Sequence, residues 1–225
     1  MPRNSKTPAP GLPLRLMLVG ATGAVGNQVL EQALRHPGIA EVVALTRRRL
    51  PAHPKLANQV VDFSNLPANA PWWAVDAVVC ALGTTLRVAG SPEAFVTVDR
   101  DWPIQVARLA RAAGASRFAL NSSLGANARS KGLYLRTKGE TEDAIGQLGF
   151  PSYTIVRPSL IDAQRQQSRP AEALGLVVAR ALRPLIPRRY RAVTPDAIAH
   201  ALLGAVLAGQ PGQQVRESET LQRPA

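Results

Sequence analysis

Apolar and polar positions alternate in blocks along this chain from Leu14 onward. Short apolar runs rich in β-prone residues are each followed by a turn or by a longer stretch in which apolar residues recur at helical spacing. The runs expected to form strands are 16–19, 42–45, 60–63, 75–82, 118–120 and 153–156, and the stretches expected to form helices are 25–34, 95–113 and 134–148. This order predicts a repeated strand–helix unit.

The predicted strands are nearly continuous apolar runs and show no strict alternation. Such runs are typical of parallel strands that are buried on both faces, with helices covering each side of the sheet. We therefore expect an α/β protein with a Rossmann-type, doubly wound parallel sheet.

The C-terminal third continues with a helical segment at 171–182, a basic loop punctuated by prolines, and a helix at 195–207. Thr194 suits the N-cap of that helix, with Pro195 at its first position. A last short strand is expected at 214–221. Residues 1–13, with four prolines, are interpreted as a disordered lead-in. Residues 14–225 form one NAD(P)-binding domain in this interpretation, in which residues 159–192 supply a small substrate cap.

Composition limits the possibilities further. The 225 residues, 46% hydrophobic and 19% charged, suffice for one sizeable core. A single cysteine, Cys80, excludes an internal disulfide, and its apolar surroundings favour a buried small hydrophobe. No apolar run approaches the ~18 residues that would cross a bilayer, and no signal peptide is evident. We expect a soluble, cytoplasmic protein without integral membrane association.

The formal net charge of +12 suits an anionic partner such as a phosphorylated ligand, a nucleic acid or a membrane surface. Basic residues are spread along the chain, with clusters at 47–49 and 183–191. Aromatic residues do not recur between them as base-stacking platforms do, so nucleic acid is not expected as a partner. The cluster at 183–191 is interpreted as a solvated loop. His36, His53 and His200 lack metal-ligand spacing, and no metal is expected.

Three glycines, Gly20, Gly23 and Gly26, follow the first predicted strand and open the first predicted helix. This is the position of a dinucleotide-binding fingerprint, although the spacing is GxxGxxG and not GxGxxG. In such a motif the first glycine permits the tight turn, the second lets the backbone approach the pyrophosphate, and the third allows close helix–sheet packing. The helix N-terminus then offers its amides to phosphate.

The second predicted strand ends at Thr46, which is followed by Arg47, Arg48 and Arg49. An NAD-specific fold places an acidic residue there, on the adenosine ribose. Guanidinium groups at this point instead bind a 2′-phosphate through charge-assisted hydrogen bonds. NADP(H) is therefore the expected cofactor. Asp62, at the end of the third predicted strand, is a weaker candidate for a contact with the adenine amino group.

Residues that suit acid–base chemistry follow the later strands. Leu82 and Gly83 are expected to lie over the cofactor, at the carboxyl end of the fourth strand. Tyr134 and Lys138, four residues apart, share one helix face, and the ammonium would stabilise the phenolate and hold the ribose hydroxyls. Ser122 or Ser123, after the fifth strand, would hydrogen-bond the substrate oxygen on which negative charge develops. Which of the two serines faces the substrate stays open.

Taken together, these motifs make the chain resemble an atypical short-chain dehydrogenase/reductase. The runs 98–101, 134–140, 156–161 and 165–170 further resemble the subfamily of the human Tat-interacting oxidoreductase, and the resemblance spans about residues 14–207. It implies that Tyr134 is the proton donor or acceptor. The cofactor contacts that it implies are Thr22, Gly23, Ala24, Val25, Arg47, Arg48, Leu82, Gly83, Ile161 and Arg169.

Three functions follow from these expectations. The first is an NADPH-dependent oxidoreductase that transfers hydride between NADP(H) and a small carbonyl or alcohol substrate. The second is an NADPH-binding, redox-sensing regulator that has little turnover and that binds a partner protein. A basic nucleic-acid-binding module is a third, weaker interpretation. The sequence names no substrate, because the residues expected to line its pocket lie in the undiagnostic region 162–191.

Overall fold

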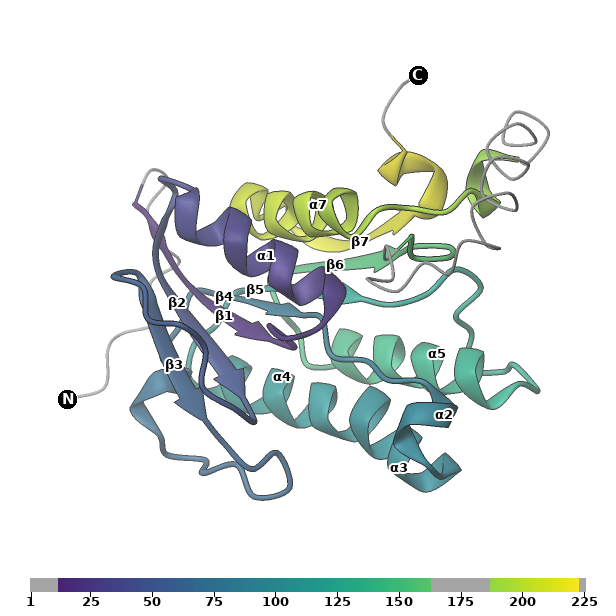
Figure 1. The fold of residues 1–225 in the computed structure, drawn as a ribbon, viewed down its shortest axis with the longest axis horizontal. Helices are drawn as coiled ribbons and strands as arrows, with labels where there is room; N and C mark the ends of the chain where they lie inside the picture. Colours follow the sequence, from purple (N-terminus) through teal and green to yellow (C-terminus); the bar gives the residue numbers. More distant parts are fainter. Residues whose placement is uncertain (1–11, 163–186, 223–225) are drawn as a thin grey trace, which may run out of the picture.

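The computed structural model describes residues 12–162 and 187–222, in which seven parallel strands form one sheet with the order β3-β2-β1-β4-β5-β6-β7 (Figure 1). Neighbouring strands in this order are all paired in parallel, and their carboxyl ends therefore share one edge of the sheet. The strands are β1 (Leu14–Val19), β2 (Ile39–Thr46), β3 (Leu56–Val60), β4 (Ala77–Cys80), β5 (Arg117–Asn121), β6 (Ser152–Arg157) and β7 (Gly212–Glu217).

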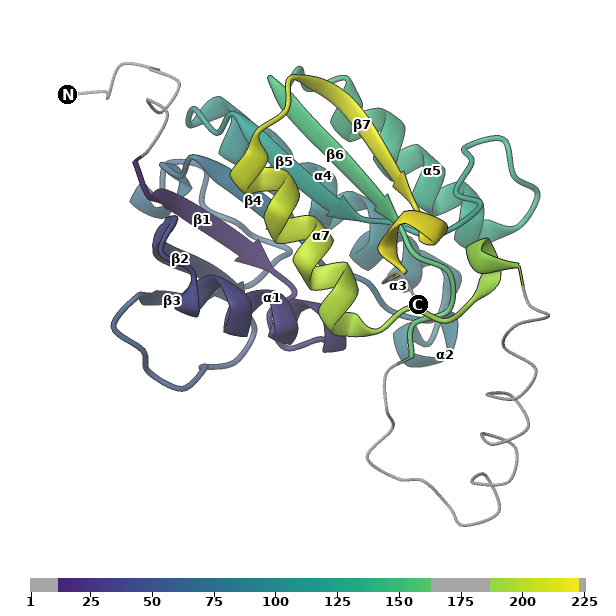
Figure 2. The ribbon, with the colours of Figure 1, turned by 90° about the horizontal axis from the view of Figure 1, so that it is seen from above.

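Helices cover both faces of this sheet, as Figure 2 shows from a second direction. One face carries α1 (Ala24–Arg35) and α7 (Pro195–Ala208), which pack side by side. The other face carries α4 (Trp102–Ala112) and α5 (Leu133–Gly146), together with the short helices α2 (Leu86–Ala89) and α3 (Pro92–Val96). The prediction of a Rossmann-type, doubly wound parallel sheet is confirmed.

Strand β1 shows why the apolar runs are continuous. Leu16 and Leu18 point into the core beneath α1 and α7, whereas Met17 and Val19 point into the core beneath α4 and α5. All four are fully buried. The chain runs from β1 outward through β2 to β3 and then returns to place β4 on the other side of β1. Ligands of open α/β sheets bind at such a change of direction, beyond the carboxyl ends of the strands.

Two predicted strands are displaced along the chain. The third strand was expected at 60–63 but ends at Val60, because Asp62 begins a turn in which its carboxylate accepts a hydrogen bond from the Ser64 amide (2.9 Å). Phe63 is buried, which explains the apolar signal there. The strand expected at 214–221 ends at Glu217, and a 3-10 turn follows at Ser218–Leu221.

The other local predictions have mixed outcomes. The Thr194 hydroxyl caps α7 by accepting the Ala197 amide (3.3 Å), as expected. Cys80 is buried, and burial raises the pKa of its thiol to about 11. The helix expected at 95–113 is interrupted by a π-helical turn, Thr97–Asp101, between α3 and α4. The lead-in, the helical segment at 171–182 and most of the predicted cap lie outside the described residues and stay predictions.

Candidate functional site

A cavity of about 390 Å³ opens at the carboxyl ends of β1, β2 and β4, where the chain changes direction across the sheet. The loop after β1 supplies one wall, the end of β2 another, and the loop after β4 a third. Six of the predicted cofactor contacts line it: Gly20, Thr22, Gly23, Arg47, Leu82 and Gly83. The sequence therefore predicted residues that meet in one groove, although they come from three separate loops.

The three glycines of the loop after β1 differ in how much space a side chain would have. A Cβ atom at Gly20, whose φ is 90°, would lie 2.5 Å from the Ala81 carbonyl oxygen. One at Gly26 would lie 2.0 Å from the Gly20 carbonyl oxygen. At Gly23, however, it would meet only the Gly20 oxygen, at 3.4 Å. Gly20 and Gly26 are thus required by the fold, whereas Gly23 leaves open space on the groove side.

Helix α1 begins directly after Gly23 with backbone amides that no side chain caps. Its first turn also has no acidic residue. Free amides and the positive end of the helix dipole attract a phosphate group, and Gly23 lets such a group approach the backbone. These residues therefore fit the pyrophosphate of a dinucleotide. Ala24 and Val25 belong to the same turn, and the Val25 side chain packs into the core.

The arginines after β2 are free to bind an anion. Arg47 lines the groove, and Arg48 and Arg49 are exposed beside it. Within the described residues, none of the three guanidinium groups has a hydrogen bond or an ion pair. The turn itself is held by the Thr46 hydroxyl, which donates to the Arg48 carbonyl (2.7 Å).

The groove contains two aromatic residues that the sequence analysis did not identify as candidate site residues. Phe63 and Trp102 stack with their ring centroids 5.2 Å apart, and both line the cavity that Arg47 also lines. An apolar wall of this kind suits the flat face of a nucleobase. Both residues fit strand or helix periodicity, so the pattern assigned them to the core. Asp62 is exposed and lies outside the groove lining, with its carboxylate engaged by Ser64.

Lys138 lies under the loop after β4. Its ammonium forms a 2.7 Å ion pair with Asp99, a buried carboxylate that also accepts the Thr84 amide (2.8 Å). A Cβ atom at Gly83 would lie 3.7 Å from the Lys138 nitrogen, so the loop passes directly over the pair. Lys138 is thus next to the groove. Asp99 was not identified as a functional residue from the sequence, although it belongs to the run 98–101.

Tyr134 stands at the start of α5 and is 40% exposed. Its ring lies 5.8 Å from that of buried Phe95, and its hydroxyl has no hydrogen-bond partner among the described residues.

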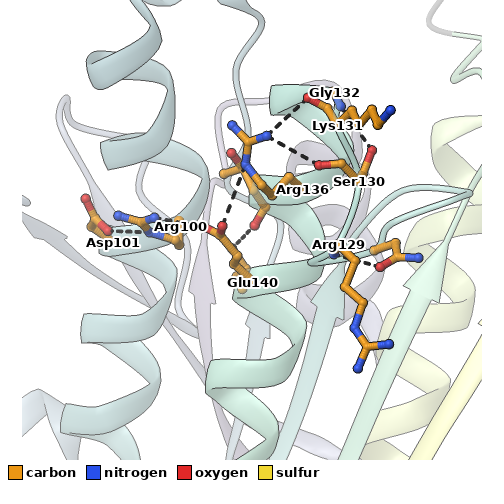
Figure 3. A network of polar contacts seen from close by, with 11 residues as sticks. Arg100, Asp101, Arg129, Ser130, Lys131, Gly132, Arg136 and Glu140 are labelled. Atoms are coloured by element: carbon orange, nitrogen blue, oxygen red, sulfur yellow. Dashed lines mark hydrogen bonds and ion pairs between the residues drawn. The ribbon is translucent and has the colours of Figure 1, made fainter.

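A polar network fixes this first turn of α5 (Figure 3). Arg136 donates to the carbonyl groups of Ser130 (3.3 Å) and Lys131 (3.1 Å), just before the helix. Arg100 pairs with Glu140 (2.8 Å) and so ties α5 to the neighbouring helix. Tyr134 therefore stands, partly exposed, on a turn that these contacts hold in place.

The structure separates the two serines after β5. Ser122 is buried and donates its hydroxyl proton to the carboxylate of Glu142 on α5. The same carboxylate accepts a hydrogen bond from Arg157 (3.0 Å), and this bond raises the pKa of the Arg157 guanidinium. Among the described residues, the Ser123 hydroxyl makes only a long contact, with the Leu124 carbonyl (3.4 Å). The Ser123 hydroxyl is therefore available to a ligand, whereas that of Ser122 is engaged in the protein.

Ile161 and Arg169 complete the predicted cofactor contacts. Ile161 follows β6 and bridges to Val193 in parallel, which ties the loop after β6 to the segment before α7. Arg169 lies outside the described residues. The side chain of Ile161 is 42% exposed and does not line the groove.

Comparison with known proteins agrees with this geometry. The sequence profile of an NAD(P)H-binding family matches residues 20–203. Protein HTATIP2 of Rattus norvegicus is 38% identical over 71% of this chain and 68% of its own length. The mitochondrial protein fmp52 of Emericella nidulans is 36% identical over 73% of this chain and 74% of its own length. A structure of MoeE5 with UDP-glucose and NAD aligns with a TM-score of 0.67 at 17% identity, covering 89% and 74% of the two chains, which shows the shared fold.

These relatives correct one expectation. Proteins named fmp52 from Emericella nidulans, Aspergillus fumigatus and Candida albicans are described as mitochondrial, which contradicts the predicted cytoplasmic localisation. The prediction relied on the lack of an apolar targeting segment. Signals for mitochondrial import are amphipathic and rich in arginine, so that lack does not distinguish the two compartments. Among the described helices, none combines the length and the apolar character that a membrane span requires.

Proposed function

The chain belongs to the NAD(P)H-binding family, and from this premise we propose that it is an oxidoreductase that transfers hydride between NADP(H) and a small carbonyl or alcohol substrate. The observation that carries the proposal is the continuity of one groove. Arg47, whose guanidinium has no partner among the described residues, lines it from the end of β2, and Gly83, next to the Lys138 ammonium, lines it from the loop after β4. The groove thus joins a group that suits anion recognition to a loop next to Lys138, while Tyr134 and Ser123 lie outside its lining.

The residues of the groove fit a dinucleotide from end to end. Phe63 and Trp102 would contact the adenine ring, and Arg47, with Arg48 beside it, would pair with the 2′-phosphate. The open face of Gly23 and the free amides of α1 would bind the pyrophosphate. Leu82 and Gly83 would then border the nicotinamide half.

Three side chains would divide the chemistry. The cofactor, when bound, supplies or accepts the hydride. The Tyr134 hydroxyl, which has no hydrogen-bond partner among the described residues, would donate its proton to the substrate oxygen during reduction and take it back during oxidation. Ser123 would donate a hydrogen bond to the same oxygen, where negative charge develops. Lys138 would hold the ribose hydroxyls and place a positive charge near the phenol.

Substitution of Arg47 tests the cofactor preference. Hydrogen bonds to charged groups contribute about 1.5 to 3 kcal/mol each, so Arg47→Ala is expected to weaken NADPH binding by about ten- to a hundredfold. NADH lacks the 2′-phosphate, and its affinity should change little. Fluorescence titration with both cofactors measures the effect. Arg49→Ala is the matched control, because Arg49 is basic, adjacent and outside the groove lining. Equal losses for both cofactors would contradict the assignment.

The two serines give a second test. Ser123→Ala is expected to lower kcat by about 10²-fold, since it removes a hydrogen bond that forms fully only in the transition state, and to leave thermal stability unchanged. Ser122→Ala should instead lower the free energy of unfolding by about 1–3 kcal/mol, because Glu142 stays buried without one of its donors. Steady-state kinetics and thermal melts separate the two effects. The reverse pattern would assign the catalytic role to Ser122.

The alternative function, an NADPH-binding regulator with little turnover, is favoured by one contact. The Lys138 charge is already paired with Asp99, which weakens its field at the Tyr134 phenol. A carbonyl panel that leaves NADPH unconsumed, while NADPH binds tightly, would support this alternative.

A further inference from the structure

Asp99 is a buried carboxylate at the meeting point of three elements. It lies on the π-helical turn between α3 and α4 and is 1% exposed. One carboxylate oxygen pairs with the Lys138 ammonium of α5 at 2.7 Å. The other accepts the amide of Thr84, which follows Gly83 in the loop after β4, at 2.8 Å. A single side chain therefore connects Lys138 to the loop that borders the groove.

The local sequence explains why the helix distorts at this residue. Pro103 has no backbone N–H, so it cannot donate to the carbonyl group four residues earlier, which is that of Asp99. The helix widens into a π-turn over Thr97–Asp101, and the Asp99 carbonyl accepts the Thr141 hydroxyl of α5 instead (3.0 Å). The backbone and the side chain of Asp99 are thus both bound to α5. Single π-turns within helices are frequent at functional sites.

A buried ion pair is a poor means of stabilising a fold. The desolvation of two charges offsets most of their attraction, and an apolar pair of similar volume often serves as well. The Asp99–Lys138 pair is also adjacent to the groove, because a Cβ atom at Gly83 would lie 3.5 Å from the Asp99 oxygen and 3.7 Å from the Lys138 nitrogen. A buried charged pair thus lies directly beside the path of a bound dinucleotide.

We propose that Asp99 is the positioning residue for Lys138, which it holds as an ammonium beneath Gly83 so that the amine meets the cofactor without rearrangement. The carboxylate acts through the lysine and does not itself touch the ligand. Its hydrogen bond from Thr84 fixes the loop after β4 at the same time, so that loop and amine keep one relative position. This inference rests on the proposed function, because it concerns the binding of NADP(H).

A double-mutant cycle on NADPH affinity tests the inference without any substrate. The four proteins are the wild type, Asp99→Asn, Lys138→Met and the double variant. Each single substitution is expected to weaken NADPH binding by about tenfold, the size of one charge-assisted hydrogen bond. The double variant should also lose about tenfold and not a hundredfold, because Asp99 has nothing to position once the ammonium is gone.

Selective labelling supplies a readout that needs no cofactor. The sequence has four lysines, Lys6, Lys55, Lys131 and Lys138, which mass spectrometry distinguishes after reaction with an acylating reagent. Asp99→Asn is expected to raise the labelling rate of Lys138 at least several-fold, because the amine is no longer held in a buried contact. Lys131, which is exposed, and Lys55, which donates to the carbonyls of His36 and Ile39, are internal controls that should not change.

Each outcome has a separate meaning. If Asp99→Asn weakens NADPH binding equally with and without Lys138, the carboxylate acts through Thr84 alone and the inference is wrong, although the proposed function stands. Unchanged labelling of Lys138 would overturn it as well. If the wild type binds no NADPH, the proposed function fails and the inference fails with it. Thermal melts show whether each variant folds. The Tm of Asp99→Asn is expected to lie below that of the double variant, in which no buried charge is left unpaired.

Discussion

Replacing Tyr134 by phenylalanine is expected to lower kcat by ~10²- to 10⁴-fold, the contribution of a well-placed acid–base group. The substitution deletes one oxygen atom and keeps the ring that packs beside Phe95, so folding and NADPH affinity should stay nearly unchanged. A loss in kcat without a loss in cofactor binding is the signature of an interaction made only in the transition state.

The measurement needs a substrate, so aldehydes, ketones and quinones are first screened for NADPH consumption by the wild-type protein. Tyr190→Phe is the matched control, because Tyr190 is also exposed and lies outside the groove lining. Wild-type turnover by Tyr134→Phe would show that the phenol is not the proton donor. Lys138→Met should lose more than Tyr134→Phe in kcat/KM, because the ammonium would serve both the ribose and the phenol.

The second large effect is expected at Gly26, where alanine should abolish dinucleotide binding. Its Cβ would lie 2.0 Å from the Gly20 carbonyl oxygen and 2.6 Å from the carbonyl carbon, so the loop or α1 must move. Overpacking of this kind costs about 1–3 kcal/mol, and the displaced amides of α1 no longer face the groove. We expect a clear fall in Tm together with the loss of NADPH binding.

Two other glycines make this result interpretable. Gly23→Ala should leave Tm unchanged, because its Cβ meets only one atom at 3.4 Å, yet it should weaken NADPH binding by filling the space next to the backbone. Gly204→Ala on α7 meets nothing within 4 Å and should raise the stability of the helix by up to about 1 kcal/mol. Thermal melts and cofactor titrations of the three variants provide the comparison. If Gly26→Ala were as stable as the wild type and bound NADPH normally, the assigned role of the loop would be wrong.

The sequence predicted those parts of the site that depend on a fixed order along the chain. Gly20, Gly23 and Arg47 follow directly after predicted strands, and the parallel sheet brings such positions to one edge. Asp99 was not found, because the pattern 95–113 is a regular helix by periodicity, and only the missing donor of Pro103 marks the π-turn. Phe63 and Trp102 satisfied the core pattern equally well, so periodicity gave no reason to separate them from buried residues.

Adjacent residues posed a different problem. Ser122 and Ser123 are the same residue type at the end of one strand, and their difference arises from Glu142 and Arg157, which are remote in sequence. No local pattern specifies which serine meets a partner that arrives from another helix. The cofactor specificity and the roles of the catalytic residues are predictions, because they depend on a cofactor and a substrate that are not part of the chain.

The pairing of α1 with α7 has a consequence for the order in which this protein folds. The helix that follows the glycine loop buries its apolar face partly against a helix from the far end of the chain, and Gln32 donates to the Asp196 carboxylate across their junction (2.9 Å). On the ribosome, α1 emerges long before its partner is synthesised. Contacts between such distant segments form late, because a long loop must close first. The glycine loop before α1 is therefore expected to reach its final position only after synthesis has passed α7, and a nascent chain that stops earlier would expose the apolar face of its first helix.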